Sequence, residues 1–563
     1  MKTIALRTPL FLASLALLVA GCSNDPPQNT NPNPTCQGAE CDAGPTCTPA
    51  TGLAGLEEGL EGATRKEYAG GGDGGLAHIT YWTLKAGTPE FDALSPEEQA
   101  KVKKVQSTVL HSQKLLPKDD IAGLEITGTL VVAGSDGERR QEIVLKVPTN
   151  WNGELVVAGT PGTRNEFASD GTIAPWILRR GYAYVSGNKG QTNGGADGNA
   201  TLLSKTHPTR HWGAMMLDMA SWASGRLEKV ACKKPARIFA AGLSNGGYQV
   251  RRALEIDAAR VKAGEARLFD GGVDWSGAYW PDARVLDTDG NGKVTPAEYA
   301  KANHLVSTNE RAALVMRWAY DPATLTTPQA YLESPPFSAA HAEMTAAGFT
   351  PASAPIWGAY NTLFDALKAQ VPSFKGIGYF NFTAYYYRAE LFGHDLAASS
   401  AYSTFQPNAV DPPPFYTWIP QAPDGGWTEE SVGYALANAN TGEFSVPLIS
   451  LHGDADALLG LDAHGVAYKA AVEKYGSPEM HRLYVIAYGG HVDLHSDGAI
   501  DFDFDGTPGE EGAADLFTPM QPYVERAFDA LVAWVKDGTA PKPSGTVATD
   551  PKNDVLDAAM IDF

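Results

Sequence analysis

The sequence predicts an α/β fold, in which a mostly parallel sheet is covered by helices on both faces and interrupted by one large insertion. Short apolar runs alternate with helix-compatible segments along most of the chain, which is the pattern of repeated β-α-β units. The 563 residues are 43% hydrophobic against 19% charged, so a sizeable buried core is expected. A formal net charge of −21 repels phosphate backbones and argues against nucleic-acid partners.

The individual elements are predicted from apolar periodicity and turn signals. The folded part is expected to open with a hairpin, residues 124–133 and 139–147, around a Ser-Asp-Gly-Glu turn. Further strands are predicted at 154–158, 182–186, 237–241, 269–275, 446–451 and 483–487, and helices at 173–180, 212–230 and 524–536.

This order divides the chain into six segments. They are a signal peptide at 1–21, a flexible tether at 22–60, a core at 61–278 and 442–545, an inserted lid domain at 279–441 and a C-terminal tail at 546–563. The lid sequence is rich in Pro and aromatic residues. Taken singly, each aromatic residue is best explained by packing within the lid, but together they suit aromatic or polyester substrates.

The N-terminus has the composition of an export signal. A basic start containing Lys2 and Arg7 precedes an apolar run too short to span a bilayer, and small residues precede Cys22. The segment resembles a bacterial lipoprotein signal, which implies cleavage before Cys22 and lipidation of that cysteine. An ordinary secretory signal is the alternative, and either one exports the protein. Ser23 and Asn24 lack the aspartate associated with inner-membrane retention, so the lipid anchor is expected in the outer membrane of the bacterial cell envelope.

Four further cysteines remain. Cys36, Cys41 and Cys47 lie in the tether, and Cys232 alone lies in the globular part. Because export permits disulfides, we interpret the tether cysteines as a small disulfide knot with one left over. Cys232 is interpreted as a buried thiol rather than a nucleophile. The absence of CxxC spacing and of a histidine partner argues against zinc.

The strongest catalytic signal is the run Gly242-Leu243-Ser244-Asn245-Gly246. It follows an apolar strand and precedes a helix-compatible run, so Ser244 is expected on a tight strand-to-helix turn that Gly242 and Gly246 permit sterically. This setting predicts a nucleophile with a helix N-terminus behind it. A glycine-rich connector with a surface serine is the alternative.

If Ser244 is the nucleophile, an acid and then a base should follow later strands. Asp454 and Asp456 both follow the strand at 446–451, and the loop pattern HGxxD favours Asp456, with helix capping as the structural alternative. His491 directly follows another strand at the edge where catalytic loops lie, which favours it as the base. His464, His481 and His495 also follow the acid but lie in less suitable places. Of these three, His495 is the second choice for the base.

The oxyanion formed when a serine attacks an acyl carbon needs N–H donors. One is expected from the backbone of Asn245, directly after the nucleophile. Another is expected from the loop after the strand at 154–158, where Pro161 has no N–H, so that Thr160, Gly162 or Thr163 must donate. An ordinary Gly-Pro turn is the alternative.

These features resemble the α/β-hydrolase superfamily over most of residues 120–545. Several segments resemble the tannase and feruloyl-esterase group more narrowly: Pro148 with Trp151-Asn152-Gly153, Arg180-Gly181-Tyr182-Ala183, the serine motif, Phe269-Asp270-Gly271, and Ala530-Leu531-Val532-x-Trp534-Val535. The serine motif is also similar to that of extracellular hydroxybutyrate-oligomer hydrolases. Both resemblances imply ester cleavage. The tannase group usually carries cysteines where this chain has Leu243 and Val492, so the substrate class is not carried over.

The insertion contains an EF-hand-type pattern with oxygen donors at loop positions 1, 3, 5, 7, 9 and 12 and Gly at position 6. The predicted ligands are Asp287, Asp289, Asn291, Lys293 through its backbone carbonyl, Thr295 and Glu298. We therefore predict a structural Ca²⁺ ion that staples the lid, with an acidic surface turn as the alternative; the resemblance likewise implies calcium in the lid. A second acidic run at 501–506 begins in the same way but has Gly512 where the closing Glu belongs, so metal loop and solvated turn stay open.

The sequence thus predicts a lipid-anchored serine hydrolase that cleaves carboxylic esters through an acyl-enzyme. A serine peptidase or amidase would use the same three side chains and differ only in the leaving group. A surface-binding lipoprotein that keeps the scaffold without the chemistry is the other alternative.

Overall fold

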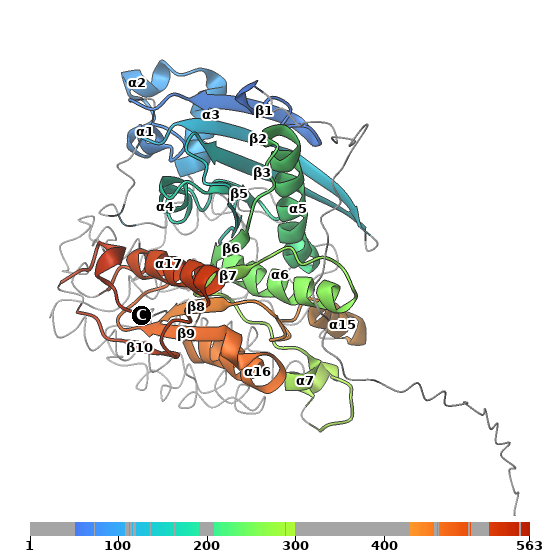
Figure 1. Cartoon of the computed structure of the whole chain (residues 1–563). Coiled ribbons are helices and arrows are strands. Elements are labelled where there is room, and N and C mark those ends of the chain that lie inside the picture. The colour runs from blue at the N-terminus through green and yellow to red at the C-terminus, as the bar shows by residue number, and fades with distance from the viewer. Residues whose placement is uncertain are drawn as a thin grey trace, which may run out of the picture. The chain divides into compact units, whose positions relative to one another are not determined.

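The computed structural model describes the part of the chain that forms the sheet and the helices around it (Figure 1). The described residues are 51–72, 74–106, 112, 115, 120–134, 137–162, 164–190, 208–287, 289–298, 428–454, 456, 459, 461–493, 496, 517–550 and 553–563. The predictions for the signal peptide, Cys22, Thr163, His495, the run at 501–506 and most of the lid lie outside them.

Ten strands of the described residues form one sheet, in the order β1-β2-β3-β5-β4-β6-β7-β8-β9-β10. They are β1 (Leu60–Tyr68), β2 (Gly123–Gly134), β3 (Gly137–Pro148), β4 (Leu155–Gly159), β5 (Ala183–Gly187), β6 (Ile238–Leu243), β7 (Gly271–Trp275), β8 (Leu448–Gly453), β9 (His481–Ile486) and β10 (Gly545–Val547). β2 and β3 form the predicted hairpin, and β3 pairs antiparallel with β5. The pairs from β5 through β10 are parallel, so the predicted mostly parallel sheet is confirmed.

Helices cover both faces of this sheet, and further short helices lie around it. They are α1 (Ile79–Thr83), α2 (Pro89–Asp92), α3 (Pro96–Gln106), α4 (Ala174–Arg179), α5 (Trp212–Ala231), α6 (Asn245–Lys262), α7 (Ala283–Leu286), α15 (Glu429–Ala437), α16 (Ala467–Tyr475) and α17 (Gln521–Asp537). One core contains apolar side chains of α4 and α17, with the rings of Trp176 and Phe528 5.3 Å apart. The other contains those of α5, α6 and α16.

The central strands are apolar on both sides because both faces are covered. In β4, Val156 and Ala158 belong to the core with α4 and α17, whereas Leu155 and Val157 belong to the core with α5 and α6. All of these side chains are completely buried. Such continuous short apolar runs made the central strands predictable from the sequence.

The folded part begins before the predicted hairpin. β1 pairs antiparallel with β2 at the edge of the sheet, and Leu56, which was assigned to the tether, is completely buried in the core. The prediction of a tether that reaches residue 60 is therefore wrong at its C-terminal end. The strand escaped notice because Glu61, Arg65 and Glu67 give it the polar composition of an exposed edge strand.

The predicted C-terminal tail is part of the fold. β10 extends the sheet beside β9, and the ring of Phe563 stacks on that of Tyr484 with centroids 4.4 Å apart. Ile561 and Phe563 both lie in the core. The chain end was assigned to a tail because its apolar residues are too widely spaced to form a periodic pattern.

Cys232 was predicted to be a buried thiol, and this prediction is wrong. Cys232 is disulfide-bonded and partly exposed, and it ends α5 in the left-handed conformation with φ of 53°. The other four cysteines of the chain lie outside the described residues. The position of Cys232 directly after a predicted helix does not indicate a disulfide.

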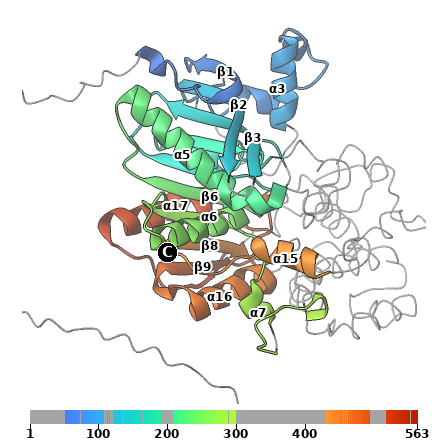
Figure 2. The ribbon, with the colours of Figure 1, turned by 90° about the vertical axis from the view of Figure 1, so that its right-hand side faces the viewer.

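The two ends of the predicted insertion lie side by side. The Asn440 N–H donates to the Trp280 carbonyl oxygen at 2.7 Å, and the Trp280 N–H donates to Asn440 Oδ1 at 3.2 Å. Figure 2 shows α7 and α15, which lie at the two ends of the insertion, next to each other. Because both ends of the insertion lie at the same place beside the sheet, the insertion does not change the order of the strands.

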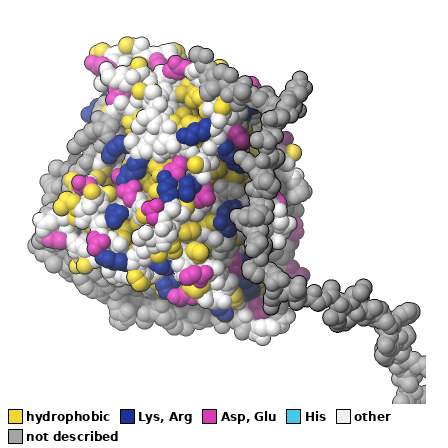
Figure 3. Space-filling view, viewed as in Figure 1, with side chains coloured by type: hydrophobic (Ala, Val, Ile, Leu, Met, Phe, Trp, Pro, Cys, Tyr) yellow, Lys and Arg dark blue, Asp and Glu magenta, His cyan; other side chains and the backbone are white. Residues whose placement is uncertain are grey.

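The surface seen in Figure 3 carries acidic and basic side chains mixed with apolar ones. Such mixing is typical of a solvated face. Within the described part of the chain, no helix has both the length and the apolar character that crossing a bilayer requires.

Candidate active site

Ser244 lies at the turn between β6 and α6 with φ of 62° and ψ of −121°. This backbone conformation is strained for a residue with a side chain and is typical of a nucleophile elbow. A Cβ atom on Gly246 would lie 2.2 Å from the Gly159 carbonyl oxygen, and one on Gly242 would lie 2.3 Å from the Gly246 carbonyl oxygen. Glycine is therefore required on both sides of the serine, as the sequence predicted.

Asp456 and His491 follow the carboxyl ends of β8 and β9, at the same sheet edge as Ser244. His491 Nδ1 lies 2.8 Å from Asp456 Oδ2 and donates to it, while the Leu459 N–H donates to Asp456 Oδ1 at 2.8 Å. Burial by itself would raise the pKa of Asp456, but the charge and hydrogen bond of His491 hold it below its ordinary value. The carboxylate is thus kept ionised beside the imidazole.

Asp454, the competing carboxylate, has a different partner. Its Oδ1 accepts a hydrogen bond of 2.7 Å from the Tyr488 N–H, and Tyr488 has φ of 58°. Asp454 therefore stabilises the tight turn that joins β9 to His491. Desolvation raises the pKa of Asp454 above its ordinary value, although the hydrogen bond from the Tyr488 N–H opposes this shift.

Two other histidines are held in structural roles. His464 Nδ1 accepts a hydrogen bond of 3.0 Å from the Tyr279 N–H, next to the start of the insertion. His481 begins β9 at the amino end of the parallel strands, and its Nε2 lies 2.9 Å from Ser450 Oγ. Burial lowers the pKa of His481 to about 3, so this imidazole is neutral at physiological pH.

His452 also belongs to the site, although it is not among the residues predicted from the sequence. It is the last residue but one of β8 and is completely buried. Its Nε2 donates to the Leu459 carbonyl oxygen at 2.6 Å and lies 3.5 Å from Asp456 Oδ2. His452 therefore holds the short loop that carries the acid. Its place at the head of the sequence His-Gly-Asp-Ala-Asp was the available signal.

A buried ion pair lies beside the turn that carries Ser244. Arg251 on α6 and Asp274 on β7 are both completely buried, with Arg251 Nη2 2.7 Å from Asp274 Oδ1. Ser450 on β8 donates to the same carboxylate. Breaking such a pair leaves an uncompensated buried charge, so this network ties the helix after Ser244 to the next two strands.

The predicted oxyanion donors lie on two adjacent loops. Asn245 is the first residue of α6 and is completely buried. Gly162 is in the loop after β4, with φ of 50°. Gly159 and Gly242 are paired in neighbouring parallel strands, and the Gly159 backbone contacts that of Gly246. The two loops therefore meet beside Ser244.

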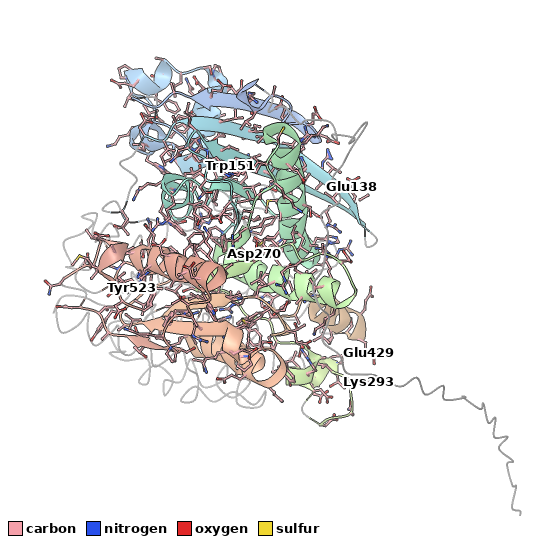
Figure 4. The ribbon with its side chains drawn as sticks, viewed as in Figure 1. Glu138, Trp151, Asp270, Lys293, Glu429 and Tyr523 are labelled. Atoms are coloured by element: carbon pink, nitrogen blue, oxygen red, sulfur yellow. The ribbon has the colours of Figure 1, made fainter. Side chains whose placement is uncertain are left out.

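The predicted metal loop follows α7. Carboxylate oxygens of Asp287, Asp289 and Glu298 lie within 4.8 Å of one another. Hydrogen bonds from backbone N–H groups, first that of Gly292, lower the pKa of Asp287, against a smaller opposing effect of desolvation. Figure 4 labels Lys293 in this loop, below α7. Three carboxylates that converge in this way offer the oxygen ligands that a hard divalent cation such as Ca²⁺ prefers.

An open pocket of about 520 Å³ lies elsewhere, at the amino end of the parallel strands. Arg237, Arg267 and Asp270 line it together with Val446 and Pro447, which precede β8, and with apolar residues of α17. It lies at the opposite sheet edge from Ser244, which follows the carboxyl end of β6, the edge where ligands of open α/β sheets bind.

The strand order and the serine elbow define the α/β-hydrolase fold that the sequence predicted. No protein-family model matches the chain, and no curated protein matches it. Among solved structures, the chain is similar to feruloyl esterase B from Aspergillus oryzae, with 14% identity, a TM-score of 0.40, and 77% of this chain and 86% of that chain covered. Tannin acyl hydrolase from Aspergillus niger has 12% identity and a TM-score of 0.38, with 77% and 82% covered. The rice cell wall degrading esterase LipA from Xanthomonas oryzae has 13% identity and a TM-score of 0.35, with 66% and 85% covered.

Proposed function

We propose that this protein is a serine hydrolase that cleaves carboxylic esters through an acyl-enzyme, with Ser244 as nucleophile, His491 as base and Asp456 as the acid. The observation that carries the proposal is the 2.8 Å contact between His491 Nδ1 and Asp456 Oδ2 at the sheet edge where Ser244 forms its strained elbow. The chemistry requires a serine, a histidine and a carboxylate, and their chain order here, serine, acid, histidine, is the one found in α/β-hydrolase folds.

Each residue has one task in the proposed mechanism. Ser244 attacks the acyl carbon as His491 Nε2 takes the hydroxyl proton, and Asp456 orients the imidazole and stabilises its cation. Backbone N–H groups of Asn245 and of Gly162 or Thr163 bind the oxyanion. His491 then gives the proton to the leaving alcohol, and water releases the acid by the same steps in reverse.

The substrate is proposed to be an ester with an aromatic or oligoester acyl group. The support is the aromatic-rich sequence of the insertion, whose ends lie next to the nucleophile helix. Tyr248 on α6 stacks on Trp280 at the insertion boundary, with ring centroids 4.4 Å apart. The described ends of the insertion thus lie beside the helix that follows Ser244, and for this reason we propose that its aromatic residues select the acyl or leaving group.

The test is hydrolysis of a p-nitrophenyl ester by purified protein lacking the N-terminal segment. Ser244→Ala and a serine-directed phosphonate should each abolish turnover, whereas Ser221→Ala on the exposed side of α5 should not change it. Turnover that survives Ser244→Ala would falsify the nucleophile assignment. A matching anilide hydrolysed as fast as the ester would favour the peptidase alternative, and a wild-type protein without turnover would favour the binding alternative.

We also propose that Ca²⁺ binds Asp287, Asp289, Asn291, Thr295, Glu298 and the Lys293 carbonyl. The support is the convergence of three carboxylates of the loop together with the spacing of its oxygen donors. When bound, the ion would cross-link the start of the insertion, and it takes no part in the reaction.

We propose further that Cys22 is lipidated and anchors the protein to the outer membrane. The support is the small-residue sequence before Cys22 and the export signal that precedes it. Expression of the full chain with labelled palmitate should give labelled, detergent-phase protein, and Cys22→Ser should remove both properties. Equal labelling of Cys22→Ser would contradict the anchor.

A further inference from the structure

Lys189 is a completely buried cation next to the proposed site. It follows β5, has φ of 62°, and its side chain has no exposure to solvent. Its Nζ lies 2.6 Å from the Thr160 carbonyl oxygen, 2.7 Å from Thr160 Oγ1 and 3.4 Å from the Pro161 carbonyl oxygen. Removing an ammonium group from water is costly, so its three N–H bonds are matched by these three oxygens.

The oxygens that Lys189 binds belong to the loop expected to form the oxyanion hole. Thr160 directly follows Gly159, whose backbone contacts Gly246 in the serine elbow. Thr160 Oγ1 also donates to the Gly187 carbonyl oxygen at 2.8 Å, which ties the loop to the end of β5. Lys189 therefore holds the loop from the side of β5.

Peptide geometry relates the lysine to the oxyanion donor. The peptide bonds of the described residues are trans, so the Pro161 C=O and the Gly162 N–H point in opposite directions. An ammonium that attracts the Pro161 carbonyl turns the Gly162 N–H away from itself. Pro161 has no N–H, which leaves Gly162 as the nearest donor that this orientation controls.

We propose that Lys189 is a positioning residue for the oxyanion hole. It orients the Gly162 N–H through the carbonyl groups of Thr160 and Pro161, and its charge adds a field that favours the developing oxyanion. The ring of Trp212, whose centroid lies 5.2 Å from Nζ, covers the cation and keeps it in place. This proposal rests on the proposed ester hydrolysis.

The experiment compares a p-nitrophenyl ester with its thionoester. The C=S sulfur accepts hydrogen bonds poorly, so the ratio of the two kcat values reports on the oxyanion hole and not on folding or on the other residues. Lys189→Met keeps the length of the side chain and removes the charge. It should lower kcat for the ester by roughly tenfold or more with little change in KM, and lower the ester-to-thionoester ratio by a similar factor.

The matched control is Lys146→Met, which removes another completely buried lysine. Lys146 Nζ donates to the Leu76 carbonyl oxygen and to Asp170, not to the Thr160 or Pro161 oxygens. It should lower the melting temperature and leave the ester-to-thionoester ratio unchanged. A Lys189→Met protein in which both substrates slow equally would overturn the proposal.

If Lys189→Met does not fold, Thr160→Val provides the same readout, because it removes one of the three oxygens that hold the Lys189 ammonium against the loop carbonyl groups. The ratio should then fall severalfold, and an unchanged ratio would overturn the proposal. The two hypotheses fail differently. A wild-type protein without serine-dependent esterase activity removes the proposed function, whereas an active wild-type protein with an unchanged ratio in the variants removes only the role of Lys189.

Discussion

The carboxyl edge of the sheet and the loop at 287–298 both gather carboxylates, but they do so in opposite ways. At the sheet edge, Asp456 is completely buried, and its partner His491 lies 35 positions away in the sequence. In the loop, Asp287 is held by the N–H groups of residues three to five positions away. The pairing of Asp456 with His491 therefore requires the whole sheet to be folded, whereas the loop at 287–298 requires only local backbone structure.

The largest expected effect tests which carboxylate belongs to the reaction. Asp456→Asn should lower kcat for a p-nitrophenyl ester by about 10⁴-fold, because the amide no longer stabilises the imidazolium. Asp454→Asn should lower it by less than about tenfold, since its oxygen still accepts from the Tyr488 N–H. Equal losses in the two variants would remove the distinction between a catalytic and a supporting aspartate.

A pH titration sharpens the comparison at the other end of β9. His481 is buried and neutral, with a pKa lowered by burial to about 3. In the unfolded chain the His481 imidazole takes up a proton near pH 6.5, whereas in the folded protein it stays neutral down to about pH 3. The contribution of His481 to the free energy of unfolding is therefore fully present above pH 6.5 and is lost as the pH falls toward 3. The free energy of unfolding in urea should decline by ~1 kcal/mol per pH unit in this window.

The variant His481→Gln should reduce that slope while leaving esterase activity at neutral pH intact, because His481 lies at the amino end of the parallel strands. An unchanged slope between pH 6 and pH 4 would show that other groups control the acid sensitivity. Activity measured at pH 7.5 serves as the control for correct folding.

The next effect concerns the glycines of the elbow. Gly246→Ala should destabilise the protein by about 2 kcal/mol or more and suppress activity, because the new Cβ would meet the Gly159 backbone. Gly225→Ala is the matched control, since a Cβ in this exposed position of α5 meets nothing within 4 Å. It should stabilise the protein by about 0.5–1 kcal/mol. Similar melting temperatures for the two variants would contradict the close approach of the loops.

The smallest effect tests the exposed loop. With Ca²⁺ at ten times its Kd, the free energy of unfolding should rise by about 1.4 kcal/mol, and a chelator should reverse this rise. Asp287→Asn should abolish the calcium-dependent shift in melting temperature, whereas Asp537→Asn at the end of α17 should preserve it. A chelator without effect on the wild-type protein would argue that the loop is an acidic surface turn.

Much of the candidate site could be predicted because its signals are local. The elbow follows from glycines beside Ser244, and the favoured acid and base follow from the ends of strongly apolar strands. Residues whose role depends on distant partners were missed. Lys189 has no sequence pattern, and the pattern that His452 begins points to the acid and not to the histidine, so the role of each is recognisable only from the loop that its side chain holds.

The edges of the fold were missed for a related reason. β1 has one exposed face and a polar sequence, and β10 spans only Gly545–Val547, too short for a periodic signal. Both strands exist because a neighbouring strand offers free hydrogen-bonding groups. Leu56 and Phe563 are likewise buried by contacts with segments far along the chain.

By itself, the sequence determined the alternation of strands and helices, the strained turn at Ser244 and the order of oxygen donors from Asp287 to Glu298, because each depends on neighbours within a few residues. Only the tertiary structure decided that Asp456 rather than Asp454 meets His491, that Cys232 is disulfide-bonded, and that a buried lysine holds the loop after β4. These contacts join segments that lie far apart in the sequence and that the sheet brings together. Hydrogen bonds of 2.6–2.8 Å require this tertiary packing, and no local sequence pattern specifies them.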